Sequence, residues 1–358
     1  MMLVRYTAET GEILDILPKA FRPLSFGDLE SGEGTQDKTY PMKIEANSIE
    51  GLPNGKQPSG PGLVSIPITF RQPVSIFGLV EGGWLPIPFV QPAKLLVDRN
   101  VVASLAQLRR GASRPDLGHT DWWFEFFKEF SVEINPALYA FEGNNRRPPT
   151  LEEFCRAFEE ASNEIAKQLP GATLTRYDRP HYQAAYALIT EFANRLQRET
   201  QFLIRIAPKL TERVADPQLP KFQSEILELG HQLELRTTSL VVLAALACLY
   251  ERRDGSGILA ARKIIKPKRA YSPDDAYNAL SDLRALEMFL SGLGLDREPF
   301  AFCTCDKAIA AFWCGLAAHS GQWIDERFSF TVSLSDDLFP RLQESGRMEL
   351  IARLTEGR

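Results

Sequence analysis

The chain of 358 residues contains few side chains that bind soft or borderline metals, with five cysteines and four histidines. Cys303 and Cys305 form a C-x-C pair inside an apolar run, and no second cysteine or histidine pair follows at zinc-site spacing. We therefore interpret both thiols as buried strand residues and do not expect a structural zinc site. An odd number of cysteines is typical of a reducing compartment.

Long hydrophobic runs are also missing. The most apolar stretch, SLVVLAALACLY at 239–250, is too short to span a bilayer and predicts a buried helix. The first residues, MMLVRYTAETGEILD, have no basic start before a long apolar segment. We therefore expect no signal peptide, no membrane association and a cytoplasmic location.

Several functional motifs are absent as well. The sequence has no G-x-x-x-x-G-K-[ST] phosphate loop, no G-x-G-x-x-G after a strand and no nucleophile elbow around a serine. The histidines lack ligand spacing, and we interpret each as structural. They are His119, His181, His231 and His319.

The charge pattern excludes a generally basic nucleic-acid coat, because the formal net charge is −5. Basic residues still cluster locally, which is compatible with a nucleic-acid enzyme but equally with a solvated surface. The clusters are Arg109-Arg110, Arg146-Arg147 and the segment from Arg262 to Arg269.

Residues 1–93 differ from the rest of the chain in their glycine and proline content. The stretch GLPNGKQPSGPG at 51–62 predicts a loop, and short β-like runs occur at 63–70 and 73–80. We expect an irregular, strand-containing N-terminal extension.

From Lys94 onward, strands and helices alternate. The predicted strands are 94–97, 131–134, 300–305 and 328–334, and each of the first three precedes a helical segment. The segment 121–130 predicts an aromatic helix, and Asn135 and Pro136 suit the N-cap and first position of the helix that ends at Gly143. This alternation predicts an α/β fold with a mostly parallel sheet flanked by helices.

Three regions follow from this pattern. Residues 94–149 and 273–358 would form the α/β core, and residues 150–272, which have helical periodicity almost throughout, would form a large helical insertion. The 273–294 segment is itself a helix, with Ser272 as its cap and Pro273 at its first position.

Four carboxylates occupy special positions in this pattern. Asp98 and Asp306 each follow a predicted strand, where parallel sheets bind their ligands. Glu142 ends a short helix and Asp282 lies within a longer one, so both can point at the same edge. Clustered carboxylates repel unless a cation neutralises them, and Mg²⁺ and Mn²⁺ prefer such oxygen ligands.

The segments that carry these acids resemble the successive acidic motifs of PIN-domain nucleases. They are LLVDRNVVASL, INPALYAFEG, ALSDLRAL and FCTCDKAIAAF. The resemblance implies that Asp98, Glu142, Asp282 and Asp306 are catalytic metal ligands, and that Asn100 and Thr304 support them. Asp336 or Asp337 would be candidates for a fifth acid.

The resemblance further implies a PIN-like fold that binds Mg²⁺ or Mn²⁺ and hydrolyses nucleic acid, RNA in preference to DNA. By analogy with the family, the chain would act as an endoribonuclease toxin or defence effector, and a homodimer and a regulatory protein partner are both open. The chain departs from the family in its helical insertion, its N-terminal extension and Arg99, where a small residue is common.

Other interpretations of the same residues stay open. Asp98 and Asp306 could be ordinary helix N-caps, Glu142 a solvated acid and Asp282 an ion-pair partner of a neighbouring helix. A haloacid-dehalogenase-like phosphatase would use Asp98 as its nucleophile and Ser335-Asp336-Asp337 as a late acidic group, although Asn100 replaces its second acid. A catalytically inactive PIN-like scaffold that binds a protein or nucleic-acid partner is the third possibility.

Overall fold

The central element is a six-stranded mixed sheet with the strand order β6-β5-β10-β7-β8-β9. A computed structural model describes residues 4–7, 11, 13–30, 38–50, 62–70, 74–90, 94–109, 132–143, 145–255, 257–293, 300–324 and 327–356. The parallel strands are β10 (Phe300–Thr304), β7 (Lys94–Val97), β8 (Glu133–Asn135) and β9 (Thr173–Leu174). β5 (Phe77–Val80) and β6 (Gly83–Pro86) extend the sheet as an antiparallel hairpin beside β10.

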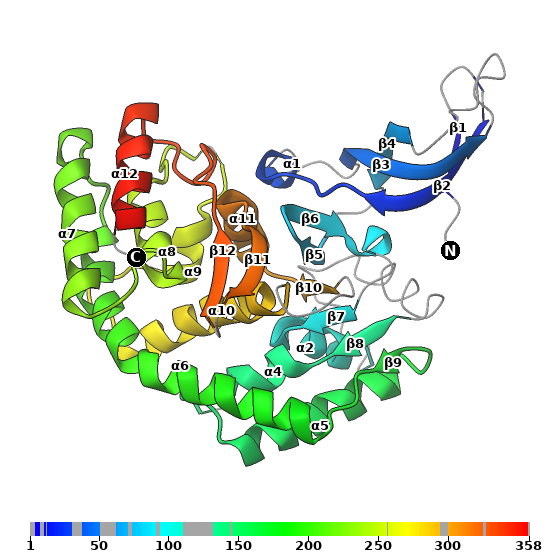
Figure 1. Ribbon diagram of the computed structural model, residues 1–358, viewed down its shortest axis with the longest axis horizontal. Coiled ribbons are helices and arrows are strands. Elements are labelled where there is room, and N and C mark those ends of the chain that lie inside the picture. The colour runs from blue at the N-terminus through cyan, green and yellow to red at the C-terminus, as the bar shows by residue number, and fades with distance from the viewer. Residues whose placement is uncertain are drawn as a thin grey trace.

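The helices next to the sheet begin where sequence patterning predicts them. α2 (Arg99–Arg109) follows β7, α4 (Ala137–Glu142) follows β8 and α11 (Lys307–Leu316) follows β10. β10 is buried along its whole length, as expected for a strand covered on both faces. The carboxyl ends of β7 and β10 therefore lie side by side, with α2 and α11 starting there (Figure 1).

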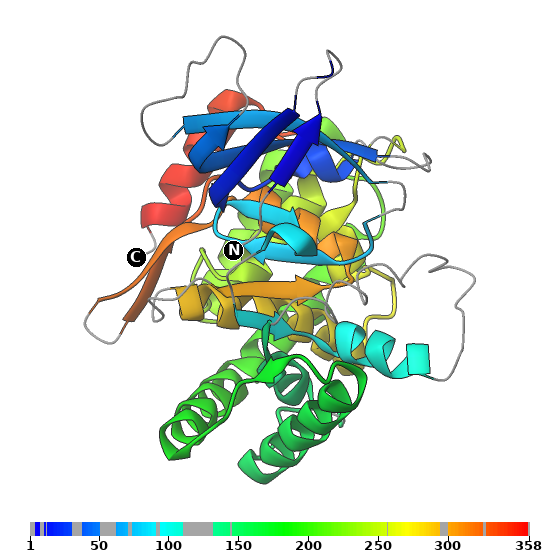
Figure 2. The same ribbon diagram turned by 90° about the vertical axis from the view of Figure 1, so that its right-hand side faces the viewer.

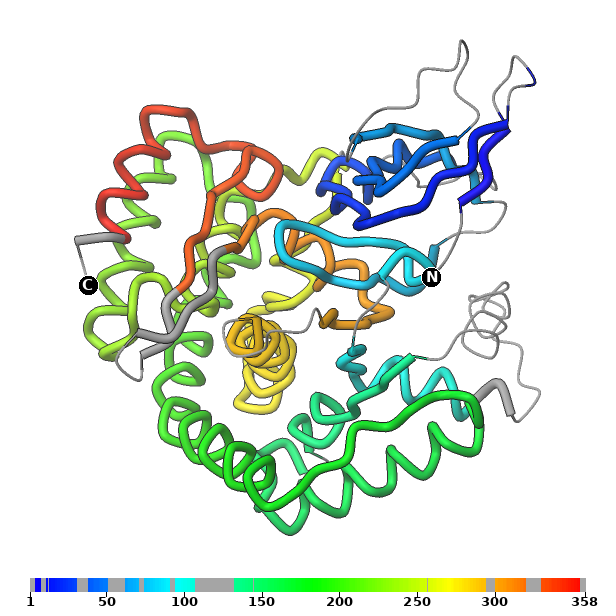
Figure 3. The backbone as a smooth tube through the Cα atoms, turned by 45° about the vertical axis from the view of Figure 1, so that its right-hand side comes forward, coloured from blue at the N-terminus to red at the C-terminus, as the bar shows by residue number. Residues whose placement is uncertain are grey.

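A long helical region encloses the sheet on one side. It contains α5 (Leu151–Gln168), α6 (Arg179–Ile206), α7 (Leu219–Gln232), α8 (Leu240–Tyr250) and α9 (Ala260–Ile265). Every residue of α8 is buried, which confirms the buried helix predicted at 239–250. α10 (Pro273–Leu293) runs through the middle of the molecule and contacts α4, α6, α8, α9 and β10 (Figure 3).

A second, antiparallel sheet lies at the N-terminal end, with the order β1-β2-β3-β4. Its strands are β1 (Val4–Thr7), β2 (Ile13–Phe21), β3 (Lys38–Glu50) and β4 (Gly62–Phe70), and α1 (Phe26–Glu30) follows β2. Trp84 joins the two sheets, because its backbone pairs with Leu24 and its Nε1 donates to the Ser25 carbonyl. A side chain at Gly83 would collide with the Leu24 carbonyl, so this close approach requires glycine.

Figure 2 shows the order of these parts, with the blue N-terminal sheet at one end, the central sheet in the middle and the green pair α5 and α6 at the other end. The remaining elements are β11 (His319–Ile324), β12 (Arg327–Thr331) and α12 (Glu344–Glu356). No helix in the described ranges combines the length and apolar character needed to cross a membrane.

The α/β class is confirmed, but the sheet differs from its prediction in three respects. β5 and β6, which fall within predicted extension 1–93, join the central sheet, because β5 pairs with β10 and β6 pairs with β5. The two-residue β9, inside predicted insertion 150–272, pairs with β8. The strand predicted at 328–334 forms a separate hairpin of β12 with β11 and does not join the central sheet. Each difference arises from pairing between segments that local periodicity does not specify.

The N-terminal strands are also more regular than expected, because β3 and β4 pair without interruption from Lys38 to Ala46. The strand predicted at 131–134 is confirmed with a shift of its bounds to Glu133–Asn135, so the N-cap of α4 is Pro136. The predicted aromatic helix 121–130 and nearly all of the predicted loop 51–62 lie outside the described residues.

Candidate functional site

Asp98 lies at the junction of β7 and α2 and has two structural contacts. Its Oδ1 accepts a hydrogen bond from the Val101 backbone N–H at 2.9 Å, which is the contact of a helix N-cap. Its Oδ2 accepts one from the Thr304 hydroxyl at 2.6 Å. The side chain is 7% exposed, so these two donors fix a buried carboxyl group.

Thr304 connects Asp98 to Asp306. While its hydroxyl donates to Asp98, its oxygen accepts from the Asp306 backbone N–H at 3.0 Å. Asp306 Oδ1 in turn accepts from the backbone N–H groups of Ala308 and Ile309, which makes it the N-cap of α11. The two strand-end acids predicted from the sequence therefore belong to one hydrogen-bonded chain, and both also cap helices.

Glu142 is the last residue of α4. Its Oε2 lies 3.8 Å from Nε of Arg99, whose guanidinium also lies 5.0 Å from the centre of the Tyr139 ring. Gly143 ends the helix with φ of +67°, a backbone conformation that favours glycine. Arg99, which departs from the family pattern, therefore supplies a positive charge to one of the four acids.

Asp98, Asn100, Glu142 and Asp282 line one small cavity of about 60 Å³, which we call the acid pocket. Asp282 reaches it from α10. Asp306 is not among the residues that line the cavity, but its charge raises the pKa of both Asp98 and Asp282. The four predicted acids are thus close enough to interact electrostatically, although they come from four segments of the chain.

The acid pocket raises the pKa of its carboxyl groups. Burial raises the pKa of Asp98 to about 7, against hydrogen bonds from Thr304 and Val101, while the charges of Glu142 and Asp306 add to the increase. Burial, followed by the charge of Asp306, raises the pKa of Asp282 to about 8, although the Lys266 charge lowers it. Burial also raises the pKa of Glu142, and Arg99 opposes this. Burial is thus the largest cause at all three residues, and the charges of neighbouring acids add to it at Asp98 and Asp282.

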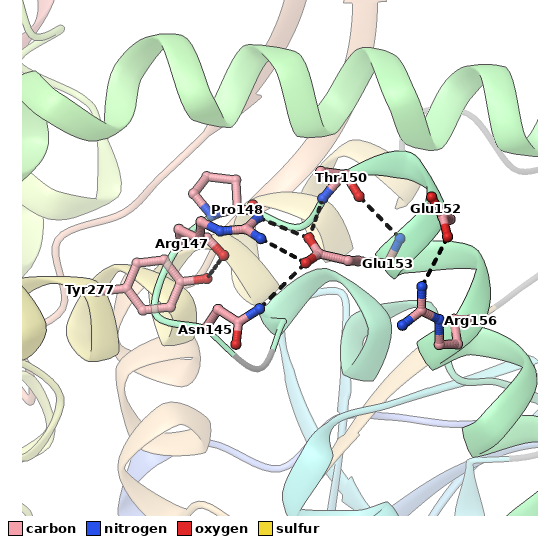
Figure 4. Close-up of polar contacts among 8 residues, drawn as sticks. All are labelled: Asn145, Arg147, Pro148, Thr150, Glu152, Glu153, Arg156 and Tyr277. Carbon is pink, nitrogen blue, oxygen red and sulfur yellow. Dashed lines mark hydrogen bonds and ion pairs between the residues drawn. The ribbon is translucent and has the colours of Figure 1, made fainter.

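The loop between α4 and α5 forms one wall of the pocket through Pro148 and Pro149. Figure 4 shows how it is held. The Tyr277 hydroxyl of α10 lies 2.8 Å from the Arg147 carbonyl oxygen and 2.8 Å from that of Glu142. Arg147 also donates two hydrogen bonds to Glu153 at 2.6 and 2.8 Å.

The helix start next to this loop is a capping box. Thr150 accepts from the Glu153 backbone N–H, and the Glu153 side chain accepts from the Thr150 backbone N–H (Figure 4). Glu153 therefore binds both the loop, through Arg147, and the first turn of α5, through Thr150. The pocket wall is thus held by α5 at one end and by Tyr277 at the other.

Several residues of the pocket were not predicted from the sequence. Arg284, two residues after Asp282, need not face the site on helical geometry alone, yet it lines the cavity. Ile189 and Phe192 of α6 also line it, which brings a helix of the predicted insertion over the acids. Lys266 was visible only as part of a basic cluster. Neither the direction of a long, flexible side chain nor a contact between distant segments of the chain can be predicted from neighbouring residues.

Arg284 is unusual because its side chain is 10% exposed and two of its nitrogens, Nε and Nη2, are buried without a hydrogen-bond partner. Its nearest carboxylate is Glu199, at 3.7 Å. Buried donors are nearly always satisfied, so these N–H groups are available to an anion that enters the pocket.

The donor set suits a hard cation in its chemistry, since all four acids offer only oxygen. Among the residues that the structure describes, however, no three His, Cys, Asp or Glu side chains are close enough to hold a metal ion together. Mutual repulsion between carboxylates accounts for separation in the absence of a cation. The residues therefore fit Mg²⁺ or Mn²⁺ by type and charge, and binding would require them to move closer.

The other predicted acids lie elsewhere. Asp336 forms an ion pair with Arg347, and the pKa of Asp337 is raised by burial and by Glu30. Neither residue lines the acid pocket, so the structure gives no support to a fifth acid there or to the late acidic group of a phosphatase.

No family model, curated protein or solved structure matches this chain.

Proposed function

We propose that this chain is a metal-dependent nuclease that hydrolyses phosphodiester bonds, most readily in RNA. The observation that carries the proposal is that the carboxyl groups of Asp98, Glu142 and Asp282, from three separate parts of the chain, line one pocket, where burial raises the pKa of each. Uncompensated acids destabilise a fold, and a site of this kind is typical of function.

The proposed ligands are Asp98, Glu142, Asp282 and Asp306. A bound Mg²⁺ or Mn²⁺ would make a water molecule easier to deprotonate and stabilise charge on phosphate oxygens. Thr304 would keep Asp98 in a fixed orientation, because its hydroxyl is itself held by the chain of hydrogen bonds to Asp306. Asn100, which lines the pocket beside Asp98, would orient a carboxylate or a water molecule.

Arg284 would contact the substrate phosphate through Nε and Nη2, which lack a hydrogen bond, although Nη2 also lies 3.7 Å from Glu199. Guanidinium groups bind phosphate through paired hydrogen bonds, so a buried arginine next to acids suits an anionic substrate. The cavity of about 60 Å³ is too small for a nucleotide. We therefore expect that substrate entry displaces the α4–α5 loop or α6, which cover it.

The decisive experiment incubates purified protein with labelled RNA and DNA in Mn²⁺, in Mg²⁺ or in EDTA. We expect RNA cleavage with metal and none in EDTA. Asp282→Asn should lower the rate by about 10²–10³, the usual effect of removing one preorganised charged group. Asp15→Asn, the same chemical change in the N-terminal sheet, where Asp15 pairs with Arg5, should cleave normally.

Cleavage that persists in EDTA, or that is equal in Asp282→Asn and Asp15→Asn, would contradict the proposal and indicate a contaminating nuclease. The second candidate is an inactive scaffold of the same fold. It is favoured by the lack, within the described residues, of three preassembled metal-binding side chains. A scaffold predicts no metal-dependent change in thermal stability.

A further inference from the structure

A second and larger cavity, of about 580 Å³, lies at the end of α8, where Tyr250 lines it. The start of α7, the end of α8 and the segment that leads into α12 surround it, and these three helices stand together at the left of Figure 1. It has no lining residue in common with the acid pocket. Its volume is in the range of small-molecule sites.

Arginines dominate the polar lining of this cavity, which we call the arginine pocket. The described lining includes five arginines and three acids. The arginines are Arg213, Arg252, Arg253, Arg341 and Arg353, and the acids are Asp216, Asp254 and Glu349. Positive charges therefore outnumber negative ones by two. This local excess of positive charge contrasts with the formal charge of −5 of the whole chain.

Two of these guanidinium groups are held in place by carbonyl oxygens. Arg253 donates to the carbonyls of Leu210 and Thr211 at 2.7 and 3.0 Å. Arg341, whose side chain is 8% exposed, donates to the Val214 carbonyl at 2.6 Å and pairs with Asp216. Asp216 therefore offsets the charge of Arg341, whereas the carbonyl oxygens orient the guanidinium of Arg253 without neutralising its charge.

The electrostatic consequence appears at Arg253. Burial and the nearby charges of Arg262 and Arg341 lower its pKa, although Glu251 and Cys248 oppose this. Cations that repel each other in a partly dry pocket are stabilised by an incoming anion.

The other walls of the pocket are apolar or neutral. Leu219 and Leu342 are buried side chains that border it, and Pro220 lies next to Leu219. Gln223 and Tyr250, joined by a hydrogen bond of 2.6 Å, supply buried polar groups. The cavity therefore offers both charge for an anion and apolar surface for a carbon skeleton.

We propose that the arginine pocket binds a phosphate-bearing small molecule of nucleotide size. Several guanidinium groups around one cavity match the oxygens of a di- or triphosphate, which accept paired hydrogen bonds. The apolar walls accommodate the base or sugar. This site does not depend on the nuclease proposal, because its residues and the acid pocket residues are separate.

The test is calorimetric titration of the full chain with ADP, pyrophosphate and adenosine in EDTA, which removes metal from the acid pocket. We expect ADP and pyrophosphate to bind, and adenosine to bind at least tenfold more weakly than ADP. The double variant Arg213→Gln and Arg252→Gln should bind ADP at least tenfold more weakly. Both residues are exposed, and Arg252 has one hydrogen bond of 3.4 Å, to the Pro340 carbonyl, so folding should be preserved.

Two further variants locate the binding. Arg156→Gln, a surface arginine that pairs with Glu152 on α5, should bind ADP like the unaltered chain. Asp282→Asn in the acid pocket should do the same. The proposal is overturned if neither ADP nor pyrophosphate binds, if the double variant binds as tightly as the unaltered chain, or if only Asp282→Asn weakens binding.

Discussion

The acid pocket and the ion-pair cluster of α6 and α10 both contain carboxyl groups whose pKa is raised by burial, but they differ in the cations that accompany these acids. The cluster consists of Arg195, Glu199, Arg284 and Glu287. Arg195 donates to Glu287 at 2.7 Å and to Glu199 at 3.3 Å, and Glu199 is only 3% exposed. Here two arginines accompany two acids, whereas Arg99 and Lys266 offset only part of the charge of the three acids that line the acid pocket and of the nearby Asp306.

The two regions differ because neighbouring turns of α10 carry one acid toward other acids and another acid toward a cation. Asp282 faces other acids, while Glu287, five residues later, faces a cation within hydrogen-bond distance. Arg284 lies between them and lines the acid pocket while approaching Glu199. Acids that are paired with arginines in the cluster and only partly paired in the acid pocket, one turn away, are evidence for a ligand in the acid pocket.

The largest effect should come from breaking the compensated side. Arg195→Ala leaves the buried Glu199 and the half-buried Glu287 without the arginine that donates to both, so we expect the free energy of unfolding to fall by about 3 kcal/mol. Urea denaturation measures it. Arg198→Ala is the control, because Arg198 forms an exposed pair with Glu234 and should cost less than about 1 kcal/mol. Equal losses in the two variants would show that the cluster is not stabilised by its pairing.

A metal cation should offset the negative charge of the acid pocket, as the arginines offset the acids of the cluster, and should therefore stabilise the fold. At a Mn²⁺ concentration a hundred times the dissociation constant, binding should stabilise the fold by about 2.7 kcal/mol. A thermal or urea scan at pH 8 with Mn²⁺ and with EDTA measures this. Asp98→Asn should lose the stabilisation and Asp15→Asn should keep it. The comparison fails if Asp98→Asn responds to Mn²⁺ as the unaltered chain does.

Without metal, the acid pocket should make stability depend on pH. The pKa of Asp282 is raised to about 8 from its ordinary value of 3.8, so the folded state holds its proton where the unfolded chain has lost it. This stabilising contribution is complete below about pH 4 and is lost as pH rises through 8. Asp282→Asn, which cannot ionise, should therefore be more stable than the unaltered chain at pH 8.

We expect a gain of about 2 kcal/mol at pH 8, less than the full pKa change implies because the side chain keeps some contact with solvent. At pH 4 the two proteins should be about equally stable. Urea denaturation in EDTA at both values is the measurement. Asp15 provides the opposite control, since its hydrogen bond from Arg5 lowers its pKa. A destabilised Asp282→Asn at pH 8 would mean that Asp282 is paired as Glu287 is.

Local patterns in the sequence were sufficient for much of this structure. Ser272 with Pro273 marks a helix start that the structure confirms. Asp98 and Asp306 were identifiable because each directly follows an apolar strand. These features depend on neighbours within a few residues, where side-chain spacing and capping chemistry determine the outcome.

Features that depend on distant pairing could not be predicted in this way. β9 has only two residues, and its pairing with β8 makes it a strand. β12 was predicted as a strand, but its partner β11 was not, so its place outside the central sheet was missed. In the pocket, the same limit hid Arg284 and the two α6 residues. It also hid Tyr277, which contacts residues 130 and 135 positions away.

Tyr277 supplies the smallest and most local test of the comparison. Its hydroxyl holds the backbone at Glu142 and Arg147, so Tyr277→Phe should lower the free energy of unfolding by about 1 kcal/mol, the usual value for one hydrogen bond. Because the loop then has one anchor fewer, hydrogen exchange of the backbone amides of residues 145–147 and 150 should speed up, while exchange in α8 should stay unchanged. Tyr186→Phe, an exposed tyrosine of α6, is the matched control. If Tyr277→Phe changes exchange no more than Tyr186→Phe does, then Arg147 and Glu153 alone hold the wall, and the position of Glu142 does not depend on α10.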